Sequence, residues 1–157
     1  MTFTFVHTAD WQIGKPFGNY PDDVAALLRE ARLDAINVAA KVAQDARARH
    51  VLVAGDVFDS AMASDKVIAQ VLFRLQRQNE ILWHLLPGNH DRCQSSRLWE
   101  RIATQRVPGN VRLHLTPTAH ELEPGIILLP APVTAKAMSD DPTRWMDDHG
   151  SPRGTIR

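Results

Sequence analysis

The sequence predicts an α/β fold built on a largely parallel sheet, and two observations support this. Apolar runs of strand length alternate along the chain with longer stretches in which apolar residues recur every three or four positions. Each of the first three apolar runs also leads into a short polar cluster that contains Asp or Asn. Strands separated by helices of this length are joined by crossover connections, which make neighbouring strands parallel.

The elements expected in the first half of the chain follow in order. Residues 3–8 are β-prone, and residues 50–54 form a nearly continuous apolar run, as is typical of a strand buried on both faces. Residues 81–86 form a third strand. Two helices separate these strands, one over 22–48 and one that begins after a capping Ser64. The expected buried face of the first helix consists of Val24, Leu27, Leu28, Ala31, Ala35, Ile36, Ala39, Val42 and Ala46.

The pattern weakens after residue 95. Residues 111–115 and 126–131 are apolar enough for two further strands, whereas 134–157 is polar and rich in Asp, Pro, Gly and Arg. We expect residues 1–157 to form a single, partial domain. An incomplete sheet would leave the segment 126–131 as an unpaired apolar edge, which favours self-association, for example as a homodimer.

The composition excludes several classes of protein. The 18 Lys and Arg residues equal the 18 Asp and Glu residues, so no global field attracts nucleic acid, although a local basic groove is compatible with this balance. No apolar run approaches the roughly 18 residues that a membrane helix needs. The lone Cys93 cannot form an internal disulfide, and the amino terminus lacks an export signal. We therefore expect a cytoplasmic protein without a membrane segment.

The three polar clusters carry the chemical information in the sequence. They are Asp10-Trp11-Gln12, Gly55-Asp56-Val57-Phe58-Asp59 and Gly88-Asn89-His90-Asp91. The loops after the carboxyl ends of parallel strands form the ligand crevice of such sheets, so the clusters are expected to meet in space. Divalent metals that handle phosphate prefer hard oxygen ligands and a few imidazoles, which these side chains can supply. Their order and position predict half of a two-metal phosphoesterase site.

The clusters, in this order, resemble the calcineurin-like metallophosphoesterase superfamily. The phrase from His7 to Phe17 is similar to the opening of the SbcD-like DNA-repair exonucleases. The resemblance is specific over residues 3–92. It implies a four-layered αββα sandwich, two metal ions, usually manganese, and phosphoester hydrolysis by a hydroxide that bridges them. It also implies DNA as a substrate and an SbcC-like ATPase as a partner.

The resemblance implies a role for each matching residue. Asp10 and Gln12 would bind the first metal, Asp56 would bridge both metals and Asn89 would bind the second. A carboxylate can bridge because its two oxygens can serve two cations, which lie roughly 3.5–4 Å apart in such sites. The amide oxygen of Asn89 is neutral and suits a metal that must leave room for substrate.

The catalytic roles fall on the last two residues of the third cluster. By the same resemblance, His90 would face the scissile phosphate and Asp91 would orient His90. An imidazole that is not a ligand can donate a proton to the leaving oxygen or stabilise the charge that develops on phosphate. An adjacent carboxylate would hold the ring and raise the pKa of the histidine.

The sequence departs from the family pattern at two points. Most members carry His where this chain has Gln12, and an amide oxygen is a weaker ligand than imidazole for manganese or zinc. The later histidines that complete the family's site do not appear before Arg157. We therefore expect an amino-terminal half of the fold that lacks three ligands, in which one or both metals are weakly held.

Other interpretations of single residues remain open. Asp59 is either a supporting residue of the site or a helix cap, and Asp, Asn and Gly are in any case common after strands. His7 and His84 lie in strands and are expected to be packed or hydrogen-bonded. Surface solvation is expected for His114, His120 and His149. Trp11 and Phe58 are expected to pack the loops, and Lys15 is either an exposed loop residue or a contact to a DNA phosphate.

Two alternatives to a DNA exonuclease also remain. One is a phosphoesterase that acts on protein or small molecules, although Ser60 after Asp59 and Asp91 after His90 differ from the usual protein phosphatase motifs. The other is a non-catalytic remnant that serves in self-association or partner binding.

Overall fold

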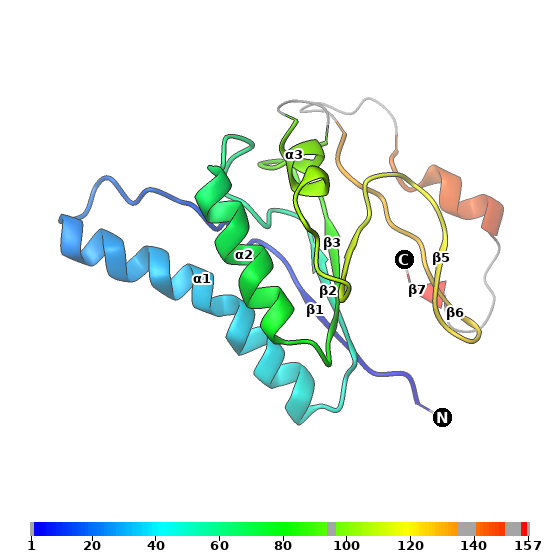
Figure 1. Cartoon of the computed structure of the whole chain (residues 1–157). Helices are drawn as coiled ribbons and strands as arrows, with labels where there is room; N and C mark the ends of the chain where they lie inside the picture. Colours follow the sequence, from blue (N-terminus) through cyan, green and yellow to red (C-terminus); the bar gives the residue numbers. More distant parts are fainter. Residues whose placement is uncertain (1, 94–96, 135–140, 150–154, 157) are drawn as a thin grey trace.

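The computed structural model describes residues 2–93, 97–134, 141–149 and 155–156, arranged in two sheets flanked by helices (Figure 1). The four-stranded sheet has the order β1-β2-β3-β4, and the three-stranded sheet has the order β5-β6-β7. The elements are β1 (Phe5–Thr8), α1 (Asp22–Asp45), β2 (His50–Ala54), α2 (Asp65–Arg77), β3 (Leu82–Leu86), α3 (Leu98–Thr104), β4 (Val111–Leu113), β5 (His120–Glu123), β6 (Ile126–Leu128), the 3-10 helix η1 (Arg144–His149) and β7 (Thr155–Ile156).

All strands of the four-stranded sheet are parallel, as the sequence predicts. Neighbouring strands pair in register, for example Val6 with Val51 and Val51 with Trp83. Helices α1 and α2 cover one face of this sheet, and the three-stranded sheet lies on the other side (Figure 1). The core between the helices and the sheet is built from large side chains such as Ile36, Leu75 and Trp83. The mixed α/β fold class is therefore confirmed.

The buried face of α1 is only partly the one predicted, because Ile36 and Ala39 are buried as expected and most of the other predicted residues are not. The helix buries Ala25, Leu33, Ile36, Ala39, Ala40 and Ala43. Leu27 and Val42, which were expected in the core, are 72% and 49% exposed, and Val38 is 59% exposed. The helix carries apolar residues on two adjacent faces, and the periodicity cannot tell which one packs. The alanine-rich face allows a close approach to the sheet, whereas Leu28, Val38 and Val42 line a groove of about 730 Å³ beside β1.

The free edge of the structure is also not the one predicted. The expected unpaired edge at 126–131 is wrong, because β6 pairs with β5 on one side and with β7 on the other. In the four-stranded sheet, β1 and β4 form the edges. Several short elements were not predicted at all, namely α3, β5, η1 and β7. Strand β5 has the sequence His-Glu-Leu-Glu, whose charged residues mask its β character.

No helix within the described ranges is long and apolar enough to cross a membrane. The capping role of Ser64 is confirmed, because its hydroxyl accepts a hydrogen bond from the amide of Val67 at 3.4 Å.

Three buried histidines form a ladder between the two sheets. His50 Nδ1 lies 3.0 Å from His84 Nε2, and His84 Nδ1 lies 2.9 Å from His114 Nε2. The His120 ring packs edge-on against His114, and Glu123 Oε1 lies 3.6 Å from His50 Nε2. The expectation that His84 is hydrogen-bonded is confirmed. The solvated surface position expected for His114 is wrong, because this residue is 4% exposed.

The histidine ladder is electrically neutral near pH 7. Burial lowers the pKa of His84 to about 3 and that of His114 to about 4, and the neighbouring rings and Arg112 lower both further. Burial also lowers the pKa of His50, although Glu123 opposes this shift. A neutral ring offers one N–H and one lone pair, so a neutral ladder satisfies both contacts. Two adjacent charged rings would place N–H against N–H.

We predict that the protein loses stability steadily as the pH falls from 6.5 toward 4. The folded pKa values lie below the unfolded value of 6.5, so the unfolded chain binds more protons in this window. Stability is complete above pH 6.5, and each histidine contributes a slope of up to about 1.4 kcal/mol per pH unit below it. Urea unfolding at several pH values measures the slope. His84→Gln should flatten it, whereas the exposed His149→Gln should not, and equal slopes in all three proteins would contradict the prediction.

The carboxyl end of α1 contains a strained residue. Ala48 N donates to Ala43 O at 2.8 Å and Arg47 N donates to Gln44 O at 3.0 Å, which is the hydrogen-bond pattern of a Schellman motif. Arg47 adopts the left-handed conformation that this motif requires, with φ 53°. Glycine adopts this conformation without a steric cost, whereas arginine does not.

Arg47→Gly is therefore expected to stabilise the protein by about 0.5–1 kcal/mol, since relief of strain outweighs the added entropy of the unfolded chain. Thermal unfolding should show a rise in Tm of roughly 1–4 °C. The matched change Arg49→Gly, two residues further on, should destabilise the protein because Arg49 is not among the residues of positive φ.

Candidate functional site

The three polar clusters meet at one edge of the parallel sheet. They follow β1, β2 and β3, which are adjacent and parallel, so their carboxyl ends lie side by side. The first loop runs along the second through backbone hydrogen bonds. Gln12 N donates to Asp56 O at 2.8 Å, and Ile13 N donates to Val57 O at 2.9 Å. The topology therefore fixes the distance between the first two clusters before any side chain is considered.

Backbone strain is concentrated among the expected metal ligands. Asp10, Gln12 and Asp56 have φ values of 56°, 45° and 52°, and they are three of the six non-glycine residues of positive φ in the described parts of the chain. Each such residue costs on the order of 1–3 kcal/mol and persists only where the surrounding structure fixes its conformation. Strain of this kind is a feature of sites in which geometry matters more than stability.

The second and third loops touch at a glycine. A Cβ added to Gly88 would lie 2.2 Å from Asp56 Oδ1, so only glycine allows this close approach. Asp56 is 5% exposed. Its Oδ1 accepts a hydrogen bond from His90 N at 2.9 Å, and its Oδ2 lies 4.0 Å from His90 Nε2. A buried carboxylate with so few donors is suited to a cation.

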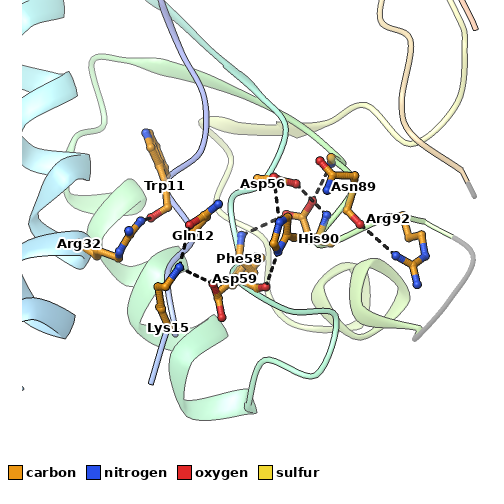
Figure 2. Close-up of polar contacts among 12 residues, drawn as sticks. Trp11, Gln12, Lys15, Arg32, Asp56, Phe58, Asp59, Asn89, His90 and Arg92 are labelled. Atoms are coloured by element: carbon orange, nitrogen blue, oxygen red, sulfur yellow. Dashed lines mark hydrogen bonds and ion pairs between the residues drawn. The ribbon is translucent and has the colours of Figure 1, made fainter. Parts of the chain in front are cut away.

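His90 is held by a different partner from the one expected. Its Nδ1 lies 3.0 Å from the carbonyl oxygen of Asp59, and its side chain is 43% exposed. Because a carbonyl oxygen only accepts hydrogen bonds, Nδ1 carries a proton. This leaves Nε2 as the nitrogen that faces Asp56 (Figure 2). Asp59 is thus a supporting residue of the site and not a helix cap, since α2 is capped by Ser64.

Asp91 fastens the loops together instead of orienting His90. It is fully buried, and its carboxylate accepts hydrogen bonds from Gly88 N at 2.6 Å and Phe58 N at 3.1 Å. Its own carbonyl oxygen accepts from Trp99 Nε1. Burial raises the pKa of Asp91, and the two backbone donors partly offset this. The expected contact between the Asp91 carboxylate and His90 does not occur in the part of the chain that the structure describes.

The oxygen of Gln12 has a cationic neighbour. Lys15 Nζ lies 3.5 Å from Gln12 Oε1 and 3.7 Å from Asp59 Oδ1 (Figure 2). Arg32, from α1, donates to the carbonyl oxygen of Trp11 at 2.9 Å and thereby holds the first loop. The sequence pattern did not identify Arg32, because nothing near it is unusual for an amphipathic helix.

Asn89 and Asp10 are the remaining expected ligands. Asn89 lies beside Asp56 and His90, and its main-chain carbonyl oxygen accepts a hydrogen bond from Arg92 at 3.0 Å (Figure 2). Asp10 is exposed. Among the described residues, no three His, Cys, Asp or Glu side chains are grouped so as to hold a metal ion. The donor set is two carboxylates and two amides, which suits a hard divalent cation through oxygen atoms alone.

Comparison with known proteins identifies a related fold and a family. A dimetal phosphatase from Danio rerio has a similar structure, with a TM-score of 0.52 and 20% sequence identity over 82% of this chain. This chain spans 44% of the length of that structure, and the likeness shows the fold. No curated protein matches the sequence. The model of the calcineurin-like phosphoesterase family matches residues 3–145. The chain therefore belongs to the calcineurin-like phosphoesterase family.

Proposed function

We propose that this chain carries the amino-terminal part of a manganese-dependent phosphodiesterase centre that acts on DNA. The observation that carries the proposal is the meeting of the three loops at Asp56, whose buried carboxylate contacts the third loop while its carbonyl oxygen holds the first. Family membership supports phosphoester hydrolysis. The phrase from His7 to Phe17 supports the DNA-repair exonuclease branch.

Each residue would have a separate role. Asp10 and Gln12 lie on the side of the first metal of the family, Asp56 would be shared by both metal positions, and Asn89 would bind at the second, where a divalent cation would stabilise the negative charge that develops on phosphate. His90 presents Nε2 on the side of Asp56, where a charged ring would donate a proton to the leaving oxygen as the phosphorus–oxygen bond breaks. The Asp59 carbonyl oxygen would keep the ring in this orientation throughout.

We also propose a partner and a location for this protein. By resemblance, an SbcC-like ATPase would be its partner in the cytoplasm. A homodimer, which the sequence suggested through an unpaired edge at 126–131, would need another surface because β6 in that segment is paired. A second candidate function is a non-catalytic remnant of the family, which serves in self-association or partner binding. It is favoured by the lack, in the described residues, of a group of three His, Cys, Asp or Glu side chains able to hold a metal ion.

Asp56→Asn is expected to weaken Mn²⁺ binding at least about tenfold without unfolding the protein, since one shared anionic ligand is lost. The new amide oxygen can still accept the hydrogen bond from His90 N, so the loop contact survives. Calorimetric titration measures the affinity, and the Tm checks the fold. Asp148→Asn, at an exposed position of η1, is the matched control and should change neither. An unchanged affinity in Asp56→Asn would place any bound metal elsewhere.

With Mn²⁺, we expect this chain to cleave DNA slowly. Turnover should fall at least about a hundredfold below that of a version extended through the further histidines that the family uses, because preorganised charge dominates such catalysis. The assay compares single-stranded DNA, double-stranded DNA and a chromogenic phosphodiester, each with Asp56→Asn as a blank. Cleavage of the chromogenic ester alone would favour a non-DNA substrate, and no cleavage by either version would favour the non-catalytic remnant. Comparable turnover by both versions would mean that this chain carries a complete centre.

A further inference from the structure

A lysine occupies the side of the centre where the family resemblance places the first metal. The oxygen of Gln12 that would bind that metal lies 3.5 Å from Lys15 Nζ. Asp59 Oδ1 lies 3.7 Å from the same nitrogen and supplies a compensating negative charge. An ammonium ion and a divalent cation repel each other, so both cannot make full use of the Gln12 oxygen at the same time.

The ammonium of Lys15 is held loosely. Both contacts are longer than the usual 2.7–3.2 Å of a strong hydrogen bond, and the side chain is 40% exposed. The two arginines beside the centre, Arg32 and Arg92, make shorter hydrogen bonds (Figure 2). Arg32 donates to the Trp11 carbonyl oxygen at 2.9 Å, and Arg92 donates to the Asn89 carbonyl oxygen at 3.0 Å. Lys15 can therefore turn toward an anion at a lower cost than either arginine.

The choice of glutamine at position 12 is consistent with this neighbour. An amide oxygen has two lone pairs and accepts hydrogen bonds from an ammonium ion without any change of protonation. The hydrogen bond from Gln12 N to Asp56 O fixes the backbone of Gln12, so the position of its Cα and the direction of its side chain are defined. The pair of Gln12 and Lys15 thus forms a coherent alternative to an imidazole with a metal.

We propose that Lys15 replaces the first metal as the cation that contacts the substrate phosphate, so that the centre works with one divalent cation and one ammonium. Lys15 would bind a non-bridging phosphate oxygen, for which a compact ammonium on a flexible stem is suited. The same ammonium would keep a second divalent cation from the Gln12 oxygen. This inference rests on the proposed function, since it names the phosphate contact of the same centre.

The test measures Mn²⁺ and inorganic phosphate binding on the whole chain, without any assay of activity. Lys15→Met should bind Mn²⁺ about tenfold more tightly, because a competing charge is lost, yet the Mn²⁺-loaded variant should bind phosphate about tenfold more weakly. A structural defect would lower both affinities together. Lys15→Arg should restore phosphate binding, and Lys66→Met, at an exposed position of α2, should change neither affinity.

A double-variant cycle sharpens the result. Gln12→His should raise the Mn²⁺ affinity only slightly with Lys15 in place, and strongly in the Lys15→Met background, where a second Mn²⁺ per chain is expected. Additive effects, or unchanged phosphate binding in Lys15→Met, would overturn the role of Lys15. The metal centre itself would still be supported if Mn²⁺ binding depended on Asp56. If neither the original chain nor any variant binds Mn²⁺, the metal centre and the role of Lys15 are both wrong.

Discussion

The buried carboxylate of Asp91 is the interaction on which the centre depends. It joins the loop after β2 to the loop after β3 by accepting from Phe58 N and Gly88 N, and these backbone donors offset part of its desolvation cost. With the loops drawn together, Gly88 can approach Asp56 closely enough for His90 N to reach the Asp56 carboxylate. The parallel strands bring the loops to one edge, and Asp91 sets their separation within that edge.

The strained residues extend the same design to the first loop. Asp10 and Gln12 share the left-handed conformation with Asp56, and their backbone is paired with the second loop. The hydrogen bonds hold a conformation that the free chain would leave, so donor atoms are placed at the expense of stability. Preorganisation of this kind is what a phosphoryl centre requires, because its acceleration comes mainly from fixed charges.

The sequence predicts the alternation of strands and helices and the three loops well, because both depend on local periodicity and turn chemistry. It does not predict contacts that depend on which surfaces meet. The partners of Asp91 lie in two loops, and the burial of His114 arises from a sheet whose first strand is mostly polar. Helix α1 carries apolar residues on both a buried and an exposed face. The neighbourhood of Gln12 and Lys15 is likewise a matter of loop geometry, although the two are only three positions apart.

The uncovered apolar face of α1 has a thermodynamic consequence. Leu27, Val38 and Val42 are already in contact with water in the native state, so unfolding hydrates less new apolar surface than the composition of the chain suggests. Because the heat capacity of unfolding grows with newly hydrated apolar area, that increment is smaller per residue than in a fully covered domain. The exposed face of α1 therefore contributes little to the heat capacity of unfolding, and covering it with a partner would sharpen the curvature of the stability curve.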